Sequence, residues 1–266
     1  MIDSIKSRLA GAPTREAKLH LLREFLQIIV LKILSDQGFF EGVVFLGGTA
    51  LRILYGLARY SEDLDFSVTD EKNYDFPKTM VALVKQLELF GLPVETRQKE
   101  GVVDSSMLRF TTVLQECGLS DLTGQKLSIK IEVDTNPPKG GKSEVHVVQD
   151  QFLFPLRAHD LPSLMAGKLH AIFCRSFVKG RDYYDLMWYL TKKISPNIEL
   201  LQNSISQTNC AIGKVTEETW KQKLKEYLEN VDYKQVLHDV EPFLMRPEEA
   251  KLLQKEYFMS LLREDL

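Results

Sequence analysis

Two acidic residues separated by one position, Asp63 and Asp65, are the part of this sequence best suited to chemistry. On a β-strand, residues i and i+2 point to the same side, so both carboxylates would face one site while Leu64 and Phe66 face the core. Two carboxylates that point together repel each other unless a cation lies between them. Their hard oxygen atoms suit Mg²⁺ or Mn²⁺, and either metal would also bind the phosphates of a nucleotide.

A pair of glycines, Gly47 and Gly48, lies upstream and follows a short apolar stretch. Thr49 then opens a segment that reads as a helix, over residues 49–55. Glycine lets the backbone approach a ligand closely, and the free N–H groups of a helix start favour an anion such as phosphate. A lone Asp-x-Asp or Gly-Gly is usually a strand edge or a turn. The ordered set of strand, glycine pair, helix and acidic strand is more specific and predicts a site for metal and phosphate.

A third carboxylate would complete a two-metal site of the kind used for in-line displacement at phosphorus. Residues 127–135 alternate strictly between apolar and polar side chains, as a half-buried strand does, and Glu132 and Asp134 lie on its polar face. Either residue is a candidate ligand. Glu132 is the better embedded, because Ile131 and Val133 flank it. The alternative is that both carboxylates belong to a solvated strand face.

Basic residues gather later in the chain. Residues 165–193 hold six basic and two acidic side chains, a local charge of +4. Lys168 and Arg175 are seven positions apart and would share a helix face, and Arg181 follows in a short loop. Such cations could hold a triphosphate, and the alternative is a solvated helix face. Asp182 would orient Lys168 or Arg175, act as a base for an acceptor, or cap a helix.

The elements that must position these residues follow from the hydrophobic pattern. Residues 1–157 mix both kinds of element: helices are predicted over 15–37 and 77–90, and strands over 43–46, 64–68, 94–98, 107–114 and 127–135. After residue 157 the strand pattern fades. The predicted helices 160–175 and 181–192 are followed by a helical pattern up to residue 266. We therefore expect an α+β fold, with an α/β lobe over residues 1–157 and a helical lobe over residues 158–266.

Composition excludes several classes of protein. The 266 residues carry 34 basic and 37 acidic side chains, a net charge of −3, which excludes a uniformly basic nucleic-acid coat. Three dispersed cysteines without a C-x-x-C pair argue against disulfides and a zinc cluster, and favour a reducing cytoplasm. The N-terminus lacks the apolar core of a signal peptide, and the most hydrophobic run, residues 25–34, is too short to span a membrane. We expect a cytoplasmic protein with no membrane partner.

Two other motifs fail on closer reading. Residues 140–143 read Gly-Gly-Lys-Ser, but the first glycine of a Walker motif is missing because Asn136 holds that position. Ser61 lacks the context of a Ser-His-Asp triad. The five histidines show no metal-ligand spacing, and we expect His170 to be packed rather than catalytic.

The motifs resemble those of the nucleotidyltransferase toxins of the AbiEii/AbiGii family, in the DNA polymerase beta-like superfamily. The matching stretches follow the family's order over roughly residues 40–190: Gly47-Gly48-Thr49-Ala50-Leu51-Arg52, Arg59-x-Ser61-Glu62-Asp63-Leu64-Asp65-Phe66, Lys168-Leu169-His170-Ala171 and Lys179-Gly180-Arg181-Asp182-Tyr183-Tyr184-Asp185-Leu186. The chain departs from the narrower Gly-Ser form of the superfamily motif by having two glycines. The last seventy or so residues add little to the resemblance.

The resemblance implies a polymerase beta-like nucleotidyltransferase lobe, a small mixed sheet with flanking helices, followed by a helical lobe, with a cleft between them. It implies transfer of a nucleoside monophosphate from an NTP to an acceptor with Mg²⁺ or Mn²⁺ as cofactor. The catalytic residues that it implies are Ser61, Asp63, Asp65, Lys168 and Asp182. Together with the chemistry above, it gives as candidate metal ligands Asp63, Asp65, Glu132 and Asp134. The candidate nucleotide ligands are Gly47, Gly48, Thr49, Arg52, Arg59, Lys168, Arg175 and Arg181.

We therefore expect the toxin of a type IV toxin–antitoxin or abortive-infection pair, with a separately encoded antitoxin as partner. By the resemblance, the acceptor is the 3′ end of a tRNA or a protein hydroxyl. One alternative is a housekeeping nucleotidyltransferase that modifies a small molecule. The other is a non-catalytic nucleotide-binding module of the same fold, although the presence of both Asp63 and Asp65 argues against it.

Overall fold

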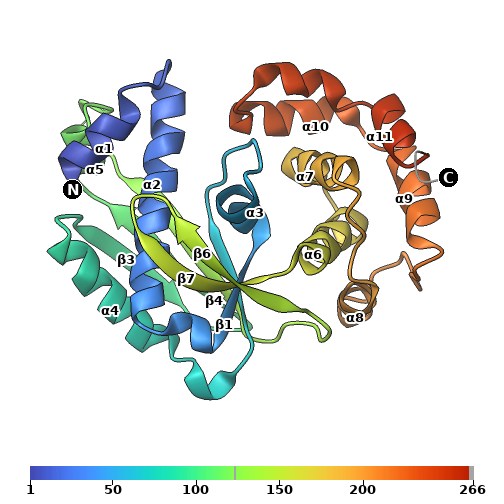
Figure 1. Cartoon of the computed structure of the whole chain (residues 1–266), viewed down its shortest axis with the longest axis horizontal. Helices are drawn as coiled ribbons and strands as arrows, with labels where there is room; N and C mark the ends of the chain where they lie inside the picture. The colour runs from blue at the N-terminus through green and yellow to red at the C-terminus, as the bar shows by residue number, and fades with distance from the viewer. Residues whose placement is uncertain (123, 264–266) are drawn as a thin grey trace. The chain divides into compact units, whose positions relative to one another are not determined.

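The β-strands lie between residues 43 and 159 and form one mixed sheet (Figure 1). The sheet has seven strands in the order β3-β4-β5-β2-β1-β7-β6. The structure is a computed structural model and describes residues 1–122 and 124–263. The strands are β1 (Val43–Leu46), β2 (Leu64–Val68), β3 (Val94–Lys99), β4 (Val103–Phe110), β5 (Leu127–Asp134), β6 (Ser143–Gln149) and β7 (Leu153–His159). β1 runs antiparallel to β2 and parallel to β7, and β2 runs parallel to β5. The expected combination of a mixed sheet with many helices is confirmed.

The chain forms two compact units, and each is assembled from segments that are not consecutive. The α/β unit comprises Met1–Ala50, Ser61–Pro137 and Val145–Ala158. The helical unit comprises Leu51–Tyr60, Pro138–Glu144 and the chain from His159 onward. Helix α3 (Gly47–Tyr55) therefore begins in one unit and ends in the other. The lobes predicted as residues 1–157 and 158–266 stay a prediction.

The core of the α/β unit is built on β5 and on two helices, α2 (Arg15–Asp36) and α4 (Phe76–Leu89), which pack against each other. The predicted alternation of β5 is confirmed, because its apolar residues are buried and its polar residues are half-buried. Thr14 caps α2 by accepting a hydrogen bond from the backbone N–H of Ala17 (3.1 Å). The long apolar run at residues 25–34 is thus a buried helix, and no helix of the described chain is long and apolar enough to cross a membrane.

Three strands differ from the sequence predictions. β4 runs from Val103 to Phe110 rather than over residues 107–114, because the polar stretch at its start is part of the sheet and residues 113–114 belong to α5 (Val113–Glu116). Asp104 there is buried and accepts hydrogen bonds from the hydroxyl of Tyr74 (2.8 Å) and the N–H of Gly101 (3.0 Å). β6 and β7 were not predicted. Their exposed faces carry apolar residues such as Val145 and Leu153, which hide the usual alternation.

The helical unit contains α6 (Leu161–Cys174), α7 (Gly180–Thr191), α8 (Ile198–Gln207), α9 (Trp220–Leu228), α10 (Tyr233–Val240) and α11 (Lys255–Leu261). The short helices α1 (Ile2–Leu9) and α5 (Val113–Glu116) belong to the other unit. α6 packs against α7 and α8, and α7 packs against α10. Asp160 caps α6, because its carboxylate accepts a hydrogen bond from the N–H of Ser163 (2.9 Å). Gly180 lets α7 approach α10, since a Cβ atom there would collide with the carbonyl of Val236.

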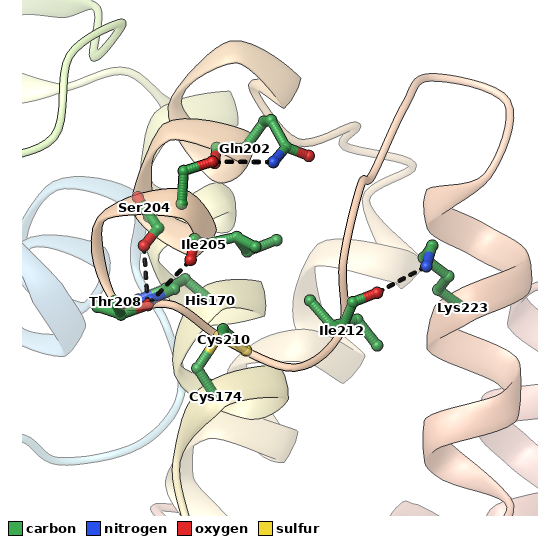
Figure 2. Close-up of a disulfide and its surroundings, with 10 residues drawn as sticks. His170, Cys174, Gln202, Ser204, Ile205, Thr208, Cys210, Ile212 and Lys223 are labelled. Atoms are coloured by element: carbon green, nitrogen blue, oxygen red, sulfur yellow. Dashed lines mark hydrogen bonds between the residues drawn. A yellow bond between two sulfur atoms is a disulfide. The ribbon is translucent and has the colours of Figure 1, made fainter.

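A disulfide bond joins Cys174, at the end of α6, to Cys210, just after α8 (Figure 2). The prediction against disulfides is therefore wrong for this pair, and Cys117 is the free cysteine. The Cα atoms are 5.3 Å apart, within the range that a disulfide can bridge. The packing of α8 on α6 brings together cysteines that are 36 positions apart, and no local motif announces such a pair. The cysteine content therefore no longer supports a reducing cytoplasm, and the cytoplasmic location stays a prediction.

The neighbourhood of the disulfide is also held by hydrogen bonds. His170 Nε2 and Thr208 Oγ1 lie 2.9 Å apart, which links the last turns of α6 to the end of α8 (Figure 2). The Lys223 ammonium donates to the carbonyl of Ile212 (2.7 Å) and ties the following loop to α9. His170 is thus packed, as the sequence predicts.

Reduction of the Cys174–Cys210 bond is expected to lower the free energy of unfolding of the helical unit by about 3–4 kcal/mol, because a long loop regains its freedom in the unfolded chain. Urea unfolding with and without a thiol reductant measures this difference. Cys174→Ser should reproduce the loss, while Cys117→Ser should leave stability unchanged. Equal unfolding midpoints in oxidising and reducing buffer would contradict the prediction.

Candidate functional site

Acidic residues gather on one face of the sheet where β2 and β5 run side by side. The register of this parallel pair sets Asp65 opposite Glu132 and Ser67 opposite Asp134. Neighbouring strands lie about 4.8 Å apart, and paired residues point to the same side of a sheet. The structure therefore brings Asp65 and Glu132 together, and Asp63 directly precedes the strand of Asp65. Asp134 lies one step further along, beside a serine.

The chemistry of these side chains suits a hard divalent cation, since all are carboxylates. Their arrangement is looser than a closed metal site: among the residues that the structure describes, no group of three His, Cys, Asp or Glu side chains lies close enough to hold a metal. Glu132 is instead paired with Lys130, whose Nζ lies 2.6 Å from Oε1 of the glutamate. The donor set fits Mg²⁺ or Mn²⁺, and Glu132 is the member that is turned toward a cation of the protein itself.

Helix α3 begins at Gly47, directly after β1 and two residues before the predicted start. The φ angle of Gly47 is +82°, a conformation that residues with a side chain rarely adopt. A Cβ atom at this position would overlap the carboxylate of Asp65. The first glycine of the motif is therefore required, because the start of the helix and the acidic strand approach each other this closely.

The loop that carries Ser61 and Asp63 is held from inside the unit. Thr49 is fully buried, and its hydroxyl is hydrogen-bonded to the Ser61 hydroxyl (2.8 Å) and to the backbone carbonyl of Asp63. The Thr49 hydroxyl is thus inaccessible and already used, and the prediction that Thr49 binds the nucleotide stays a prediction that concerns its backbone N–H. Its contribution is to fix the two predicted catalytic residues.

Two residues of α2 support the same loop, and the sequence predictions missed both. Gln27 is 1% exposed and donates from Nε2 to the carbonyl of Ser61 (3.3 Å). Arg23, one helical turn earlier, forms an ion pair with Glu62 (3.3 Å). Gln27 could have been found from the sequence, because it is a polar residue inside the most apolar run of the chain. A polar side chain on a buried helix needs a hydrogen-bond partner.

In the helical unit, the predicted cations and Asp182 do converge. Lys168 Nζ lies 2.9 Å from Asp182 and 2.8 Å from Asp185, and Arg175 also pairs with Asp182. Burial opposes the charge on Lys168, but the two carboxylates outweigh it and raise the pKa of this lysine. Burial likewise opposes the charge on Asp182, yet Lys168 and Arg175 lower its pKa. Asp182 lies in the first turn of α7, whose N-cap is Lys179, so its predicted role as the cap is wrong.

Arg59 occupies a position that the sequence did not anticipate. Its side chain is 2% exposed. Nε (2.6 Å) and Nη2 (2.7 Å) donate to the carboxylate of the fully buried Asp185, and Nη1 donates to the carbonyl of Tyr60 (2.9 Å). These contacts enclose the guanidinium of Arg59, and its predicted binding of a nucleotide stays a prediction. Asp185, which the sequence predictions did not include, contacts both Arg59 and Lys168.

The remaining candidates are placed more simply. Gly48 lies in the first turn of α3. Arg52 donates from Nη1 to the carbonyl of Leu57 (2.9 Å), which closes the turn after α3. Arg181 lies over the ring of Phe243, 4.1 Å from its centre. Tyr183 and Tyr184 are 2% exposed each and belong to the core of the helical unit.

Comparison with known proteins decides the family. Residues 29–257 match the family described as "Nucleotidyl transferase AbiEii toxin, Type IV TA system". The chain belongs to this AbiEii family. No curated protein matches the chain.

Two crystal structures from Helicobacter pylori share the fold of this AbiEii-family chain. The protein JHP933 superposes with a TM-score of 0.54 at 19% sequence identity, over 92% of each chain. A second H. pylori protein, named there as a candidate nucleotidyltransferase, superposes with a TM-score of 0.55 at 20% identity, over 92% of this chain and 95% of the other. At this level of identity the likeness establishes the fold alone.

Gly47→Ala is expected to destabilise the α/β unit by about 2–4 kcal/mol, since it adds both an unfavourable φ angle and an overlap with Asp65. Gly56→Ala is the matched control, because Gly56 has a φ of +71° but nothing within 4 Å of a Cβ atom. Urea unfolding of both variants isolates the contribution of the overlap. Equal losses of stability in the two variants would show that Asp65 does not require the glycine.

Asp185→Asn is expected to lower the free energy of unfolding of the helical unit by about 3–5 kcal/mol, because it leaves the buried Arg59 without its counter-charge. The exposed pair of Lys32 and Asp36 provides a control, since Asp36→Asn should cost less than about 0.5 kcal/mol. Thermal unfolding compares the two. A loss as small for Asp185→Asn as for Asp36→Asn would mean that the buried pair is not structural.

Proposed function

We propose that this AbiEii-family protein transfers a nucleoside monophosphate from an NTP to an acceptor hydroxyl, with Mg²⁺ or Mn²⁺ held by Asp63, Asp65 and Glu132. The observation that carries the proposal is the register of β2 and β5, which pairs Asp65 with Glu132 beside the glycine that opens α3. Membership of a family of nucleotidyltransferase toxins supports the same reaction. Glu132 is preferred to Asp134 as the third carboxylate because it lies one register step closer to Asp65.

The α/β unit supplies the groups that such a reaction needs. The first N–H groups of α3, from Gly47 to Thr49, have no partner within the helix and would bind phosphate oxygens. Thr49 and Gln27 hold the loop of Ser61 and Asp63 in place before substrate arrives, and such preorganisation is the main source of catalysis in phosphoryl transfer. A bound divalent cation would neutralise the carboxylates and the phosphate oxygens.

In the proposed reaction, the oxygen of the acceptor hydroxyl forms a bond to the α-phosphorus of the NTP. The bond from that phosphorus to the oxygen that bridges to the β-phosphate breaks, and pyrophosphate leaves. The hydroxyl proton passes to a carboxylate or to water. No redox change occurs, so no further co-reactant is needed.

For the helical unit we propose that Lys168, Arg175 and Arg181 contribute positive charge for phosphate binding. Asp182 and Asp185 hold the Lys168 ammonium from two sides and orient it. The resemblance to the family motif makes Lys168 the residue most needed for activity. Arg59 is left out of this group, because Asp185 encloses it.

We further propose that the protein is the toxin of a type IV toxin–antitoxin pair, with the 3′ end of a tRNA as acceptor and a separately encoded antitoxin as partner. The family description supports the toxin role. Incubation with each α-labelled NTP, and with either total RNA or total protein, identifies the nucleotide and the class of acceptor. Label on protein but not on RNA would contradict the tRNA proposal. Normal growth during expression of the active enzyme would contradict the toxin proposal.

Asp65→Asn is expected to reduce the rate of nucleotide transfer at least 100-fold, because it removes a charge on which metal binding depends. Glu132→Gln should have a comparable effect, whereas Asp134→Asn should remain within a few-fold of wild type. The rate of incorporation of labelled nucleotide measures all three, and Asp36→Asn controls for the loss of an exposed carboxylate. Full activity of Asp65→Asn would overturn the assigned site.

A further inference from the structure

One cation lies among the acidic residues of the sheet face, and nothing in the proposed reaction uses it. Lys130 is on β5, two residues before Glu132, and therefore on the same face. The register sets Leu64 opposite Ile131 and Asp65 opposite Glu132. Two residues before this pair, Lys130 is still on β5, while Asp63 directly precedes β2. Asp65 thus lies opposite Glu132, with Asp63 and Lys130 close by along the chain.

Contacts of the Lys130 side chain agree with this register. Its ammonium lies 2.6 Å from Oε1 of Glu132. The hydrogen bond to Glu132 raises the pKa of Lys130, and the charges of Asp63 and Asp65 add to this effect. A lysine side chain is a cation at neutral pH, so this contact brings a positive charge directly against Glu132 on the acidic face of the sheet.

We infer that Lys130 is a built-in counter-cation of the acidic site, which holds Glu132 and competes with the divalent metal ion. This inference rests on the proposed function, since it assigns a role to Lys130 toward the proposed metal site. Three carboxylates and one ammonium carry a net charge of −2, against −3 without the lysine. Lys130 thus weakens the binding of a free metal ion and favours the metal that arrives already bound to the phosphates of an NTP.

A different role for Lys130 would be to bind a phosphate of the substrate directly. That role predicts a higher KM for the NTP in a neutral variant, with no change in metal affinity. The counter-cation role predicts the opposite for the metal: removal of the charge strengthens the binding of metal alone. Metal affinity in the absence of nucleotide therefore separates the two roles, and it does not depend on enzymatic activity.

The chain offers a matched control. Lys126 lies just before β5 and pairs with Glu95 at 2.6 Å, the same distance as between Lys130 and Glu132. Both lysines are partly exposed on the α/β unit, with side-chain exposures of 30% and 38%. Lys126→Met therefore removes an equivalent ion pair away from the acidic residues.

The experiment is a titration of the full-length protein with Mn²⁺ alone, followed by electron paramagnetic resonance of the free ion. Lys130→Met should lower the Kd for Mn²⁺ about tenfold, because the local field becomes more negative. Lys130→Gln should do the same, and Lys130→Arg and Lys126→Met should match wild type. In a chelating buffer, the unfolding temperature of Lys130→Met should fall below that of Lys126→Met, and Mn²⁺ should restore it.

The outcomes separate failure of this inference from failure of the proposed function. If wild type and both neutral Lys130 variants bind no Mn²⁺, the proposed metal site itself is wrong. If wild type binds Mn²⁺ and Asp65→Asn does not, but Lys130→Met and Lys130→Gln bind with unchanged or weaker affinity, the site stands and the counter-cation role is overturned.

Discussion

Carboxylates that lie close together repel one another, and both units of this protein depend on cations of their own to offset that repulsion. In the α/β unit, Lys130 lies beside Glu132 among the acidic residues of β2 and β5. In the helical unit, Asp182 and Asp185 are buried and are matched by Lys168, Arg175 and Arg59. The two arrangements differ in solvation. The first is half-exposed, whereas the carboxylates of the second are buried and link α6 to α7.

The sequence is most informative where one residue pattern has one physical meaning. The alternation of residues 127–135 predicts β5 and its polar face, since a strand buried on one side must alternate. The pair of Asp63 and Asp65, read as a short acidic strand after a glycine pair, likewise predicts the acidic face of the sheet. The motifs that resemble the AbiEii family are local in the chain, and each could be read without knowledge of the fold.

The missed disulfide and the missed contacts of the candidate site depend on contacts between distant segments. Arg59 reads as a cation beside an acidic motif, and its burial against Asp185, which is 126 positions away, is invisible in the sequence. The same holds for the bond between Cys174 and Cys210, which exists because α8 packs on α6. Gln27 interrupts an apolar run for a reason that lies on another segment, the carbonyl of Ser61. A polar residue in a buried helix shows that a partner exists and leaves the partner unnamed.

The path of the chain through α3 determines which products of genetic recombination would keep a buried ion pair. The segment Leu51–Tyr60 follows the glycine motif directly and belongs to the helical unit, where its Arg59 neutralises Asp185. If recombination joined the chain from His159 onward to an N-terminal segment without this arginine, Asp185 would lose its counter-charge. Its carboxylate would then be unpaired in a core that water does not reach. A breakpoint near residue 159 would therefore keep the buried pair only if the new N-terminal part supplied an arginine at the position of Arg59. Because neither unit is one contiguous stretch of chain, a single cut does not separate them.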